Sequence, residues 1–216
     1  ACKKHNSKLV FFDNVYAYGL TQGPMTEQTP FKPNSKKGEV RARIATMLLD
    51  EIKQQNIQGM IVRSADFYGP GALLSLTHNT VTLRLKAGKS PQWIGDPRTV
   101  HTFTFTPDAG KTVAVLGNSP NAYNQTWHSL TSKQIITGEE YVRIACETIG
   151  QPFKGITAMP KWAVRMIGLF VPVLREFTEM MYQFENDYIF DSSKAETFIG
   201  TKATSYKDGI AAAMNK

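Results

Sequence analysis

Two apolar runs of the sequence each lead into a polar and aromatic segment. Residues 8–12 are followed by the segment 13–19, and residues 60–62 are followed by the segment 63–71. Continuous apolar runs of this kind are typical of strands covered by helices on both faces, as in parallel α/β sheets. Because ligands of such sheets bind at the carboxyl ends of the strands, the pattern predicts an α/β fold with a ligand site where the two polar segments meet.

A helical pattern lies between the two predicted strands. Its apolar positions, which we expect to pack on the sheet, are Val40, Ile44, Met47, Leu48 and Ile52. They follow Gly38, and Gly59 separates this helical segment from the second predicted strand. Farther along, residues 73–88 mix helical and extended character, residues 93–97 predict a short strand and turn, and residues 100–105 alternate like a strand.

Capping signals predict two more helices. Thr106 and Pro107 suit an N-cap and a first helical residue, which predicts a helix over residues 108–116. Thr137 and Glu140 have capping-box spacing for a helix over residues 138–149, and a glycine follows it as a stop.

Composition is that of a globular protein. The chain has 216 residues, of which 42% are hydrophobic and 11% aromatic, so it can bury a sizeable core. Its 25 Lys and Arg residues outnumber 18 Asp and Glu residues and give a net charge of +7. The basic residues are spread along the chain without a long run or an aromatic stacking motif, so we expect no nucleic-acid partner.

Cysteines, histidines and apolar segments limit the function classes further. Cys2 and Cys146 lie far apart, which is typical of a reduced, cytoplasmic protein. No metal site is predicted, because metal-ligand spacing is missing among His5, His78, His101 and His128. The apolar segment 162–174 is shorter than the roughly 20 residues of a spanning helix, so we expect no membrane and interpret it as a helix that covers a core or a partner.

Several segments carry a family resemblance. FFDNVYAYG (11–19), TEQTPFKPNSKKGEVRARIATMLL (26–49), IVRSADFYGPG (61–71), FTFTPDA (103–109) and DSSK (191–194) follow one another in this order. Together they resemble an extended or atypical short-chain dehydrogenase/reductase of the NAD-dependent epimerase/dehydratase type. The resemblance implies a Rossmann-like doubly wound parallel sheet with a smaller α+β substrate lobe, NAD or NADP as cofactor, and a small-molecule substrate such as a nucleotide sugar. It also permits a homodimer.

The resemblance covers only part of such a fold. Members hold the cofactor pyrophosphate on a Gly-rich turn before a helix, and this sequence has no G-x-G-x-x-G or G-x-x-G-x-x-G. We therefore expect a fragment that contains the C-terminal part of the sheet. In this interpretation residues 1–71 are a partial Rossmann-like sheet half, and residues 72–216 are a substrate-facing lobe with a returning strand and helices of the same domain.

The catalytic pattern of the family is altered. Short-chain dehydrogenases use a Tyr four residues before a Lys, and this sequence has no Y-x-x-x-K. By resemblance, Lys37 holds the nicotinamide ribose, although it can equally be a solvated lysine in a polar turn. Tyr16 and Tyr18 are candidates for a displaced acid or a ribose contact, or else they pack with their hydroxyls in solvent. Asn14 takes the place of the usual Ser or Thr and can orient a substrate oxygen.

The remaining candidates are implied as ligand contacts by the same resemblance. For the cofactor they are Asn14, Lys37, Arg63, Ser64, Asp66 and Phe67. For the substrate they are Tyr68, Trp93, Arg98, His101 and Phe103. Arg63 can alternatively form a buried structural ion pair, and Trp93 and Arg98 can lie on the rim surface.

The sequence leaves three functions open. The first is an NAD(P)-dependent epimerase, dehydratase or reductase that transfers a hydride to or from a polar alcohol or carbonyl. The second is a non-catalytic member that senses a dinucleotide or binds a partner, which the missing Y-x-x-x-K favours. The third is a scaffold half that needs its N-terminal lobe to bind anything.

Overall fold

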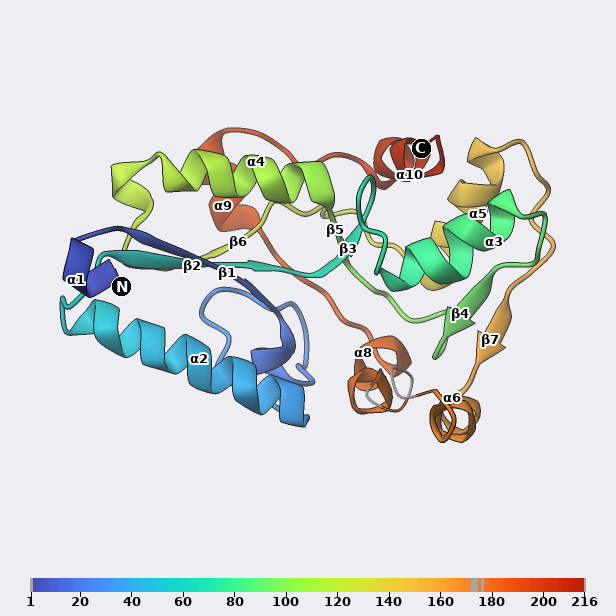
Figure 1. Ribbon diagram of the computed structural model, residues 1–216. Coiled ribbons are helices and arrows are strands. Elements are labelled where there is room, and N and C mark those ends of the chain that lie inside the picture. The colour runs from blue at the N-terminus through green and yellow to red at the C-terminus, as the bar shows by residue number, and fades with distance from the viewer. Residues whose placement is uncertain (1, 172–174, 176, 216) are drawn as a thin grey trace.

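The computed structural model describes residues 2–171, 175 and 177–215. Figure 1 shows strands lying between long helices in one half of the molecule, and shorter helices and strands in the other half. The elements of the first half and its returning segment are α1 (Cys2–His5), β1 (Leu9–Asn14), η1 (Tyr16–Tyr18), α2 (Lys36–Lys53), β2 (Gly59–Ser64), α4 (Thr106–Gly117), η3 (Pro120–Ala122), β6 (Thr126–His128) and α9 (Ser193–Ile199). Those of the lobe are β3 (Asp66–Tyr68), η2 (His78–Thr82), α3 (Leu83–Lys86), β4 (Gln92–Ile94), β5 (Phe103–Phe105), α5 (Gly138–Thr148), β7 (Thr157–Met159), α6 (Lys161–Gly168), η4 (Thr178–Met180), α8 (Tyr182–Glu185) and α10 (Tyr206–Met214).

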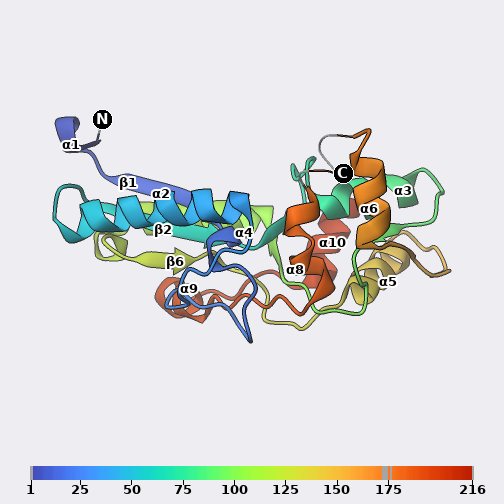
Figure 2. The same ribbon diagram turned by 90° about the horizontal axis from the view of Figure 1, so that it is seen from below.

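The sheet has the parallel order β1-β2-β6. Leu9 pairs with Gly59 and Asn14 with Ser64, so the carboxyl ends of β1 and β2 lie side by side. In both views α2 and α4 lie on opposite faces of the sheet (Figures 1 and 2). Helices on both faces explain why the central strand β2 is buried along its whole length, and they confirm the predicted parallel α/β fold.

Helix α2 lies between the two strands as the sequence predicts, and the predicted apolar stripe is confirmed at Leu48 and Ile52 but wrong at two other positions. Ser35 accepts a hydrogen bond from the Gly38 amide (3.0 Å) and caps the helix. Val40 and Met47, which were expected to pack on the sheet, are exposed. The buried positions are Gly38, Ala45, Leu48 and Ile52. Gly38 has no side chain and lies close to the Tyr16 carbonyl oxygen, so this side of the helix packs inward and Val40 and Met47 lie on the solvent side.

The two predicted caps have different outcomes. The capping box of α5 is confirmed: Glu140 N donates to the Thr137 hydroxyl (3.2 Å), and Thr137 N donates to Glu140 Oε2 (2.8 Å). The predicted N-cap of α4 is wrong, because Thr106 is already helical and follows the N-cap residue Phe105. The Thr106 hydroxyl instead donates to the Pro70 carbonyl (2.7 Å) and ties the helix to the turn after β3.

The lobe surrounds an aromatic core. Strands β3 and β5 pair in parallel, as do β4 and β7. Tyr68, Trp93, Phe103, Tyr141 and Tyr206 are buried together there. The expected strand near residues 93–97 corresponds to β4, and the mixed segment 73–88 contains the π-helical η2 followed by α3.

The apolar segment predicted as a helix over residues 162–174 corresponds in its first part to α6, and residues 172–174 lie outside the described residues. Within residues 2–171, 175 and 177–215, no helix combines the length and apolar character needed to span a membrane.

Candidate functional site

Small polar residues line the carboxyl edge of the sheet. Asn14 ends β1 and accepts a hydrogen bond from the Tyr16 amide through Oδ1 (3.1 Å), which turns the chain into η1. Ser64 ends β2 beside it, and Ser129 follows β6 and donates from its amide to the Arg63 carbonyl (2.7 Å). The hydroxyls of Ser64 and Ser129 are buried and have no hydrogen-bond partner in the described part of the chain.

A chain of buried side chains links the tips of the three strands. Arg63 donates from Nε to Asp13 Oδ2 (3.2 Å) and from Nη1 to the Tyr18 hydroxyl (2.9 Å). The Tyr18 hydroxyl lies 2.7 Å from His128 Nε2, and His128 Nδ1 lies 2.7 Å from the Asp191 carbonyl oxygen. Because a carbonyl only accepts, Nδ1 carries the ring proton and Nε2 accepts from Tyr18. Arg63 is thus held in a buried ion pair, the alternative that the sequence left open for it.

Burial sets the protonation of this network. It lowers the pKa of His128 from 6.5 to about 3, and the Arg63 charge acts in the same direction. Burial also raises the pKa of Tyr18, against the opposing effect of Arg63. Both side chains are therefore neutral at pH 7. Tyr18 uses its hydroxyl on Arg63 and His128 and is fully buried, so an acid role for Tyr18 requires this network to open.

A pocket of about 650 Å³ lies where the chain leaves β1 and β2. Tyr16 from η1 and Asp66 and Phe67 from β3 line it, together with Leu73, Leu74 and Phe184 from the lobe. The negative charge of Asp66, followed by burial, raises the pKa of the Tyr16 hydroxyl, so Tyr16 keeps its proton. The two polar segments therefore face one pocket, as their positions after adjacent parallel strands predict.

His101 lies behind this pocket rather than in it. Its side chain is 2% exposed, and its Nε2 lies 3.0 Å from Oδ2 of Asp66, whose side chain is 27% exposed. The ring stacks on Phe184 with centroids 4.3 Å apart. A ligand in the pocket would thus meet Asp66 first and His101 only through it.

The sequence and the fold agree on the family. A family model for the NAD dependent epimerase/dehydratase family matches residues 1–126, which is more than half of the chain. The chain belongs to this family. A search of curated proteins gave no match.

Solved structures similar to this chain share its fold. A dTDP-glucose 4,6-dehydratase from Bacillus anthracis has a TM-score of 0.79 at 18% identity, over 99% of this chain and 63% of its own. A UDP-glucuronic acid 4-epimerase from Bacillus cereus has a TM-score of 0.77 at 18% identity, over 99% of this chain and 62% of its own. A UDP-N-acetylglucosamine 4-epimerase from Methanobrevibacter ruminantium has a TM-score of 0.77 at 15% identity, over 99% of this chain and 64% of its own. The first two were crystallised with NAD, and the chain spans less than two thirds of each structure.

Lys37 is the residue that we expect to contact the nicotinamide ribose, and it lies in the first turn of α2. Its side chain is 39% exposed, and Nζ lies 4.0 Å from Glu179 Oε1. Glu179 also accepts from the Lys36 amide (2.9 Å) and so satisfies one of the free amides at the start of the helix. Lys37 is accessible to a ligand, but Lys37 does not line the 650 Å³ pocket.

The expected substrate contacts fall into two groups. Tyr68, Trp93 and Phe103 are buried in the aromatic core of the lobe, where they support the pocket wall; direct contact with a substrate stays a prediction. Arg98 is 80% exposed and makes a two-pronged ion pair with Asp96, with nitrogen–oxygen distances of 3.0 and 2.8 Å.

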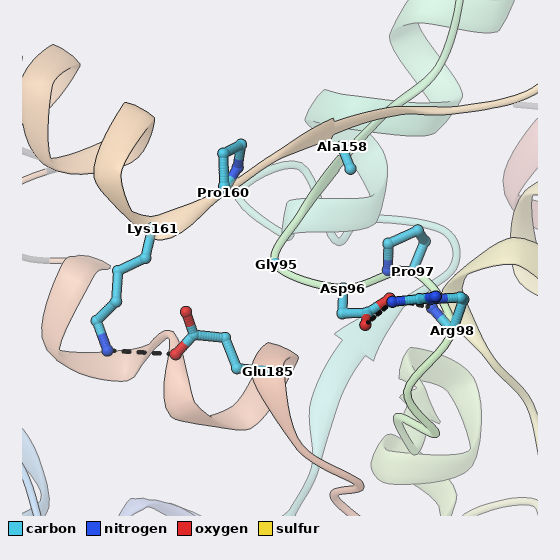
Figure 3. A pocket seen from close by; sticks show the side chains of 8 residues that line it. All are labelled: Gly95, Asp96, Pro97, Arg98, Ala158, Pro160, Lys161 and Glu185. Carbon is cyan, nitrogen blue, oxygen red and sulfur yellow. Dashed lines mark hydrogen bonds and ion pairs between the residues drawn. The ribbon is translucent and has the colours of Figure 1, made fainter.

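Arg98 borders a second groove, of about 470 Å³, between the turn after β4 and the start of α6 (Figure 3). Across this groove Lys161 donates to Glu185 (3.2 Å). Both basic groups are thus paired with a carboxylate, and an anionic ligand would have to compete with these partners.

The residues at the sheet edge fit the nicotinamide and ribose end of a dinucleotide. The unpaired hydroxyls of Ser64 and Ser129 would be satisfied by polar ligand atoms or water. Phe67 adds an apolar wall beside the polar groups Tyr16 and Asp66, which is typical of a small-molecule site. The sequence given has no Gly-rich turn for the pyrophosphate, so the fit concerns the nicotinamide end alone.

Some residues of the site were not found from the sequence. Asp13, His128 and Asp191 complete the network around Arg63, and no local motif marks them as partners, since Tyr18 and His128 are 110 positions apart. The one available signal was the buried position of Arg63 in an apolar strand, which requires a carboxylate nearby. Among the described residues, no group of three or more His, Cys, Asp or Glu side chains could hold a metal ion.

Proposed function

We propose that the protein, at its full natural length, is an NAD(P)-dependent epimerase, dehydratase or reductase. Its substrate would be a sugar nucleotide or a similar polar alcohol or carbonyl compound. The observation that carries the proposal is the pocket lined by Tyr16, Asp66 and Phe67 at the carboxyl edge of the sheet, in a chain of the NAD dependent epimerase/dehydratase family. The similar dehydratase and epimerase structures support it.

Within this proposal the cofactor end is held from the strand tips. The bound nicotinamide would exchange a hydride with the substrate carbon. Asn14 and Ser64 supply hydrogen-bonding groups at the ends of β1 and β2, and Phe67 supplies an apolar wall. Lys37 approaches the ribose from the start of α2. Arg63 acts from inside the sheet by fixing the tips through Asp13 and Tyr18.

The substrate oxygen would lie between Tyr16 and Asn14. Tyr16 keeps its proton, so its hydroxyl can donate a hydrogen bond to a carbonyl or alcohol oxygen. The Asn14 amide can orient the same oxygen. The lobe residues Arg98 and His101 would act farther out, Arg98 on a phosphate or carboxylate group and His101 through Asp66.

The test is turnover by the full-length protein. A panel of sugar nucleotides is incubated with NAD⁺ or NADP⁺, the sugar products are identified by NMR, and cofactor reduction is followed by absorbance. Both readouts are needed because an epimerase or dehydratase returns the hydride to its substrate and leaves no net reduced cofactor. We expect conversion of at least one member, and no conversion of any member by either readout would contradict an enzymatic role. Lys37→Ala should lower kcat by about 10²-fold if Lys37 assists proton transfer. Lys53→Ala removes an exposed lysine from the last turn of the same helix and is the matched control. Full activity in Lys37→Ala removes that role from Lys37.

The second candidate is a dinucleotide-sensing or partner-binding protein without turnover. The missing Y-x-x-x-K favours it. Calorimetry with NAD⁺ and NADP⁺ distinguishes the two candidates from an inert scaffold: binding with no turnover across the panel supports the sensor, and binding with turnover supports the enzyme.

A further inference from the structure

Asp66 and His101 share a proton at the pocket wall. His101 Nδ1 lies 2.9 Å from the Gln183 carbonyl oxygen, which only accepts, so Nδ1 carries a proton. His101 Nε2 lies 3.0 Å from Asp66 Oδ2, and this second contact requires another proton, on the ring or on the carboxyl group. One proton therefore lies between Nε2 of His101 and Oδ2 of Asp66 and joins them in a hydrogen bond.

The pair is rigid on one side and open on the other. His101 is held between its stack on Phe184, with an interplanar angle of 6°, and its contact with Gln183. Asp66 lines the pocket, and its Oδ1 has no hydrogen-bond partner among the described residues. One carboxylate oxygen is thus fixed by the protein, and the other is available to a ligand.

Few other groups in this region can move a proton. Tyr16 and Asp66 are the titratable side chains among the described residues that line the pocket. The other titratable groups whose charges act here are the guanidinium of Arg41, from α2, and the phenols Tyr182, from α8, and Tyr188, after it. A guanidinium stays protonated and accepts no proton. Burial raises the pKa of both of these phenols, and Asp66 with burial raises that of Tyr16, so all three phenols remain protonated hydrogen-bond donors. A protonated phenol cannot take a proton from an alcohol.

We propose that Asp66, held in place by His101, is the proton acceptor of the reaction and takes over the role of the absent Y-x-x-x-K pair. The inference rests on the proposed function and names a catalytic residue for it. The substrate hydroxyl loses its proton to Oδ1 of the Asp66 carboxylate while the bridging proton stays on His101 Nε2. The substrate carbon would lose a hydride to the nicotinamide, so the alcohol becomes a carbonyl. In the reverse direction Asp66 returns the proton to the oxygen. His101 is a positioning residue, because it acts through Oδ2 and does not face the pocket.

Asp66→Asn is the first test, in the full-length protein. The amide cannot accept the proton, so kcat should fall by about 10²- to 10⁴-fold while KM changes little. Asp50→Asn makes the same change at an exposed position of α2 and should match the wild type. A wild type that turns over, with an Asp66→Asn variant within about threefold of it, overturns the inference and leaves the proposed function standing. If the wild type turns over no substrate, the proposed function itself is wrong.

His101 variants test the positioning role. His101→Phe can keep the stack on Phe184 and removes both hydrogen bonds, and we expect kcat to fall by about 10- to 100-fold with little change in KM. His101→Gln can still donate to Asp66 and should recover much of this loss. Wild-type activity in His101→Phe overturns the positioning role. This comparison also decides the question if Asp66→Asn does not fold.

The proton between His101 and Asp66 can also be detected directly, without any turnover. Proton NMR of the wild type without cofactor should show a strongly downfield His101 Nε2–H signal, assigned by its coupling to ¹⁵Nε2 in labelled protein, that disappears in Asp66→Asn and persists in Asp50→Asn. Absence of such a signal in the wild type, or its persistence in Asp66→Asn, overturns the pair.

Discussion

Mild acid should destabilise this protein through His128. The ring is buried, donates from Nδ1 to the Asp191 carbonyl and accepts from the Tyr18 hydroxyl at Nε2. A proton added to Nε2 would face a hydroxyl that already receives a hydrogen bond from the Arg63 cation. The folded protein therefore resists protonation of His128, whose pKa falls from 6.5 to about 3.

The size of the effect follows from proton linkage. Between pH 6.5 and about 3 the unfolded chain binds a proton at His128 and the folded chain does not, so stability decreases as the pH falls through this window. At pH 7.5 both states are neutral and the stabilising effect is fully present. One pH unit inside the window is worth about 1.4 kcal/mol, so His128 alone lowers the free energy of unfolding by about 2 kcal/mol at pH 5.

Urea unfolding followed by tryptophan fluorescence, at half-unit steps from pH 7.5 to 5, measures this slope. His128→Gln keeps an acceptor and a donor but does not titrate, so its slope near pH 5 should be smaller than that of the wild type by about 1.4 kcal/mol per pH unit. His5→Gln makes the same substitution in the exposed α1 helix and is the control. Equal slopes for wild type and His128→Gln would refute the buried, neutral His128.

Four further substitutions test other parts of the fold by the same unfolding assay. Gly19→Ala should cost more than about 3 kcal/mol, because φ is +68° and the new Cβ would lie against the Lys32 carbonyl. Gly200→Ala, at φ +69° with open space around it, should cost only about 1 kcal/mol, and equal costs would contradict the close approach. Tyr18→Phe leaves Nη1 of Arg63 and Nε2 of His128 each without a hydrogen-bond partner and should cost about 3 kcal/mol; a cost below about 1 kcal/mol would argue against the network. Thr137→Ala removes the capping box of α5 and should cost about 1 kcal/mol, whereas an unchanged midpoint would show that the cap adds nothing.

Local signals in the sequence predicted most of the fold. The two apolar runs became the adjacent parallel strands β1 and β2, and the Thr137 and Glu140 pair became a capping box, because both depend on neighbouring residues alone. The stripe of α2 was wrong at Val40 and Met47, since apolar spacing does not reveal which side of a wide apolar face meets the sheet.

The candidate site was less accessible from the sequence. Strand topology placed Tyr16, Asp66 and Phe67 at one pocket, and the sequence could predict this much. It could not predict that Tyr18 turns inward to Arg63 or that His101 lies behind Asp66, because such pairings join residues far apart in the chain and depend on side-chain packing.

A crystal structure of the full-length protein with a bound nicotinamide dinucleotide would test the central claim most directly. We predict that the nicotinamide ring lies against Phe67, with its reactive face toward Tyr16 and Asp66, at the carboxyl ends of β1 and β2. A nicotinamide located in the groove beside Arg98, or a dinucleotide that leaves the Tyr16 and Asp66 pocket empty, would contradict it.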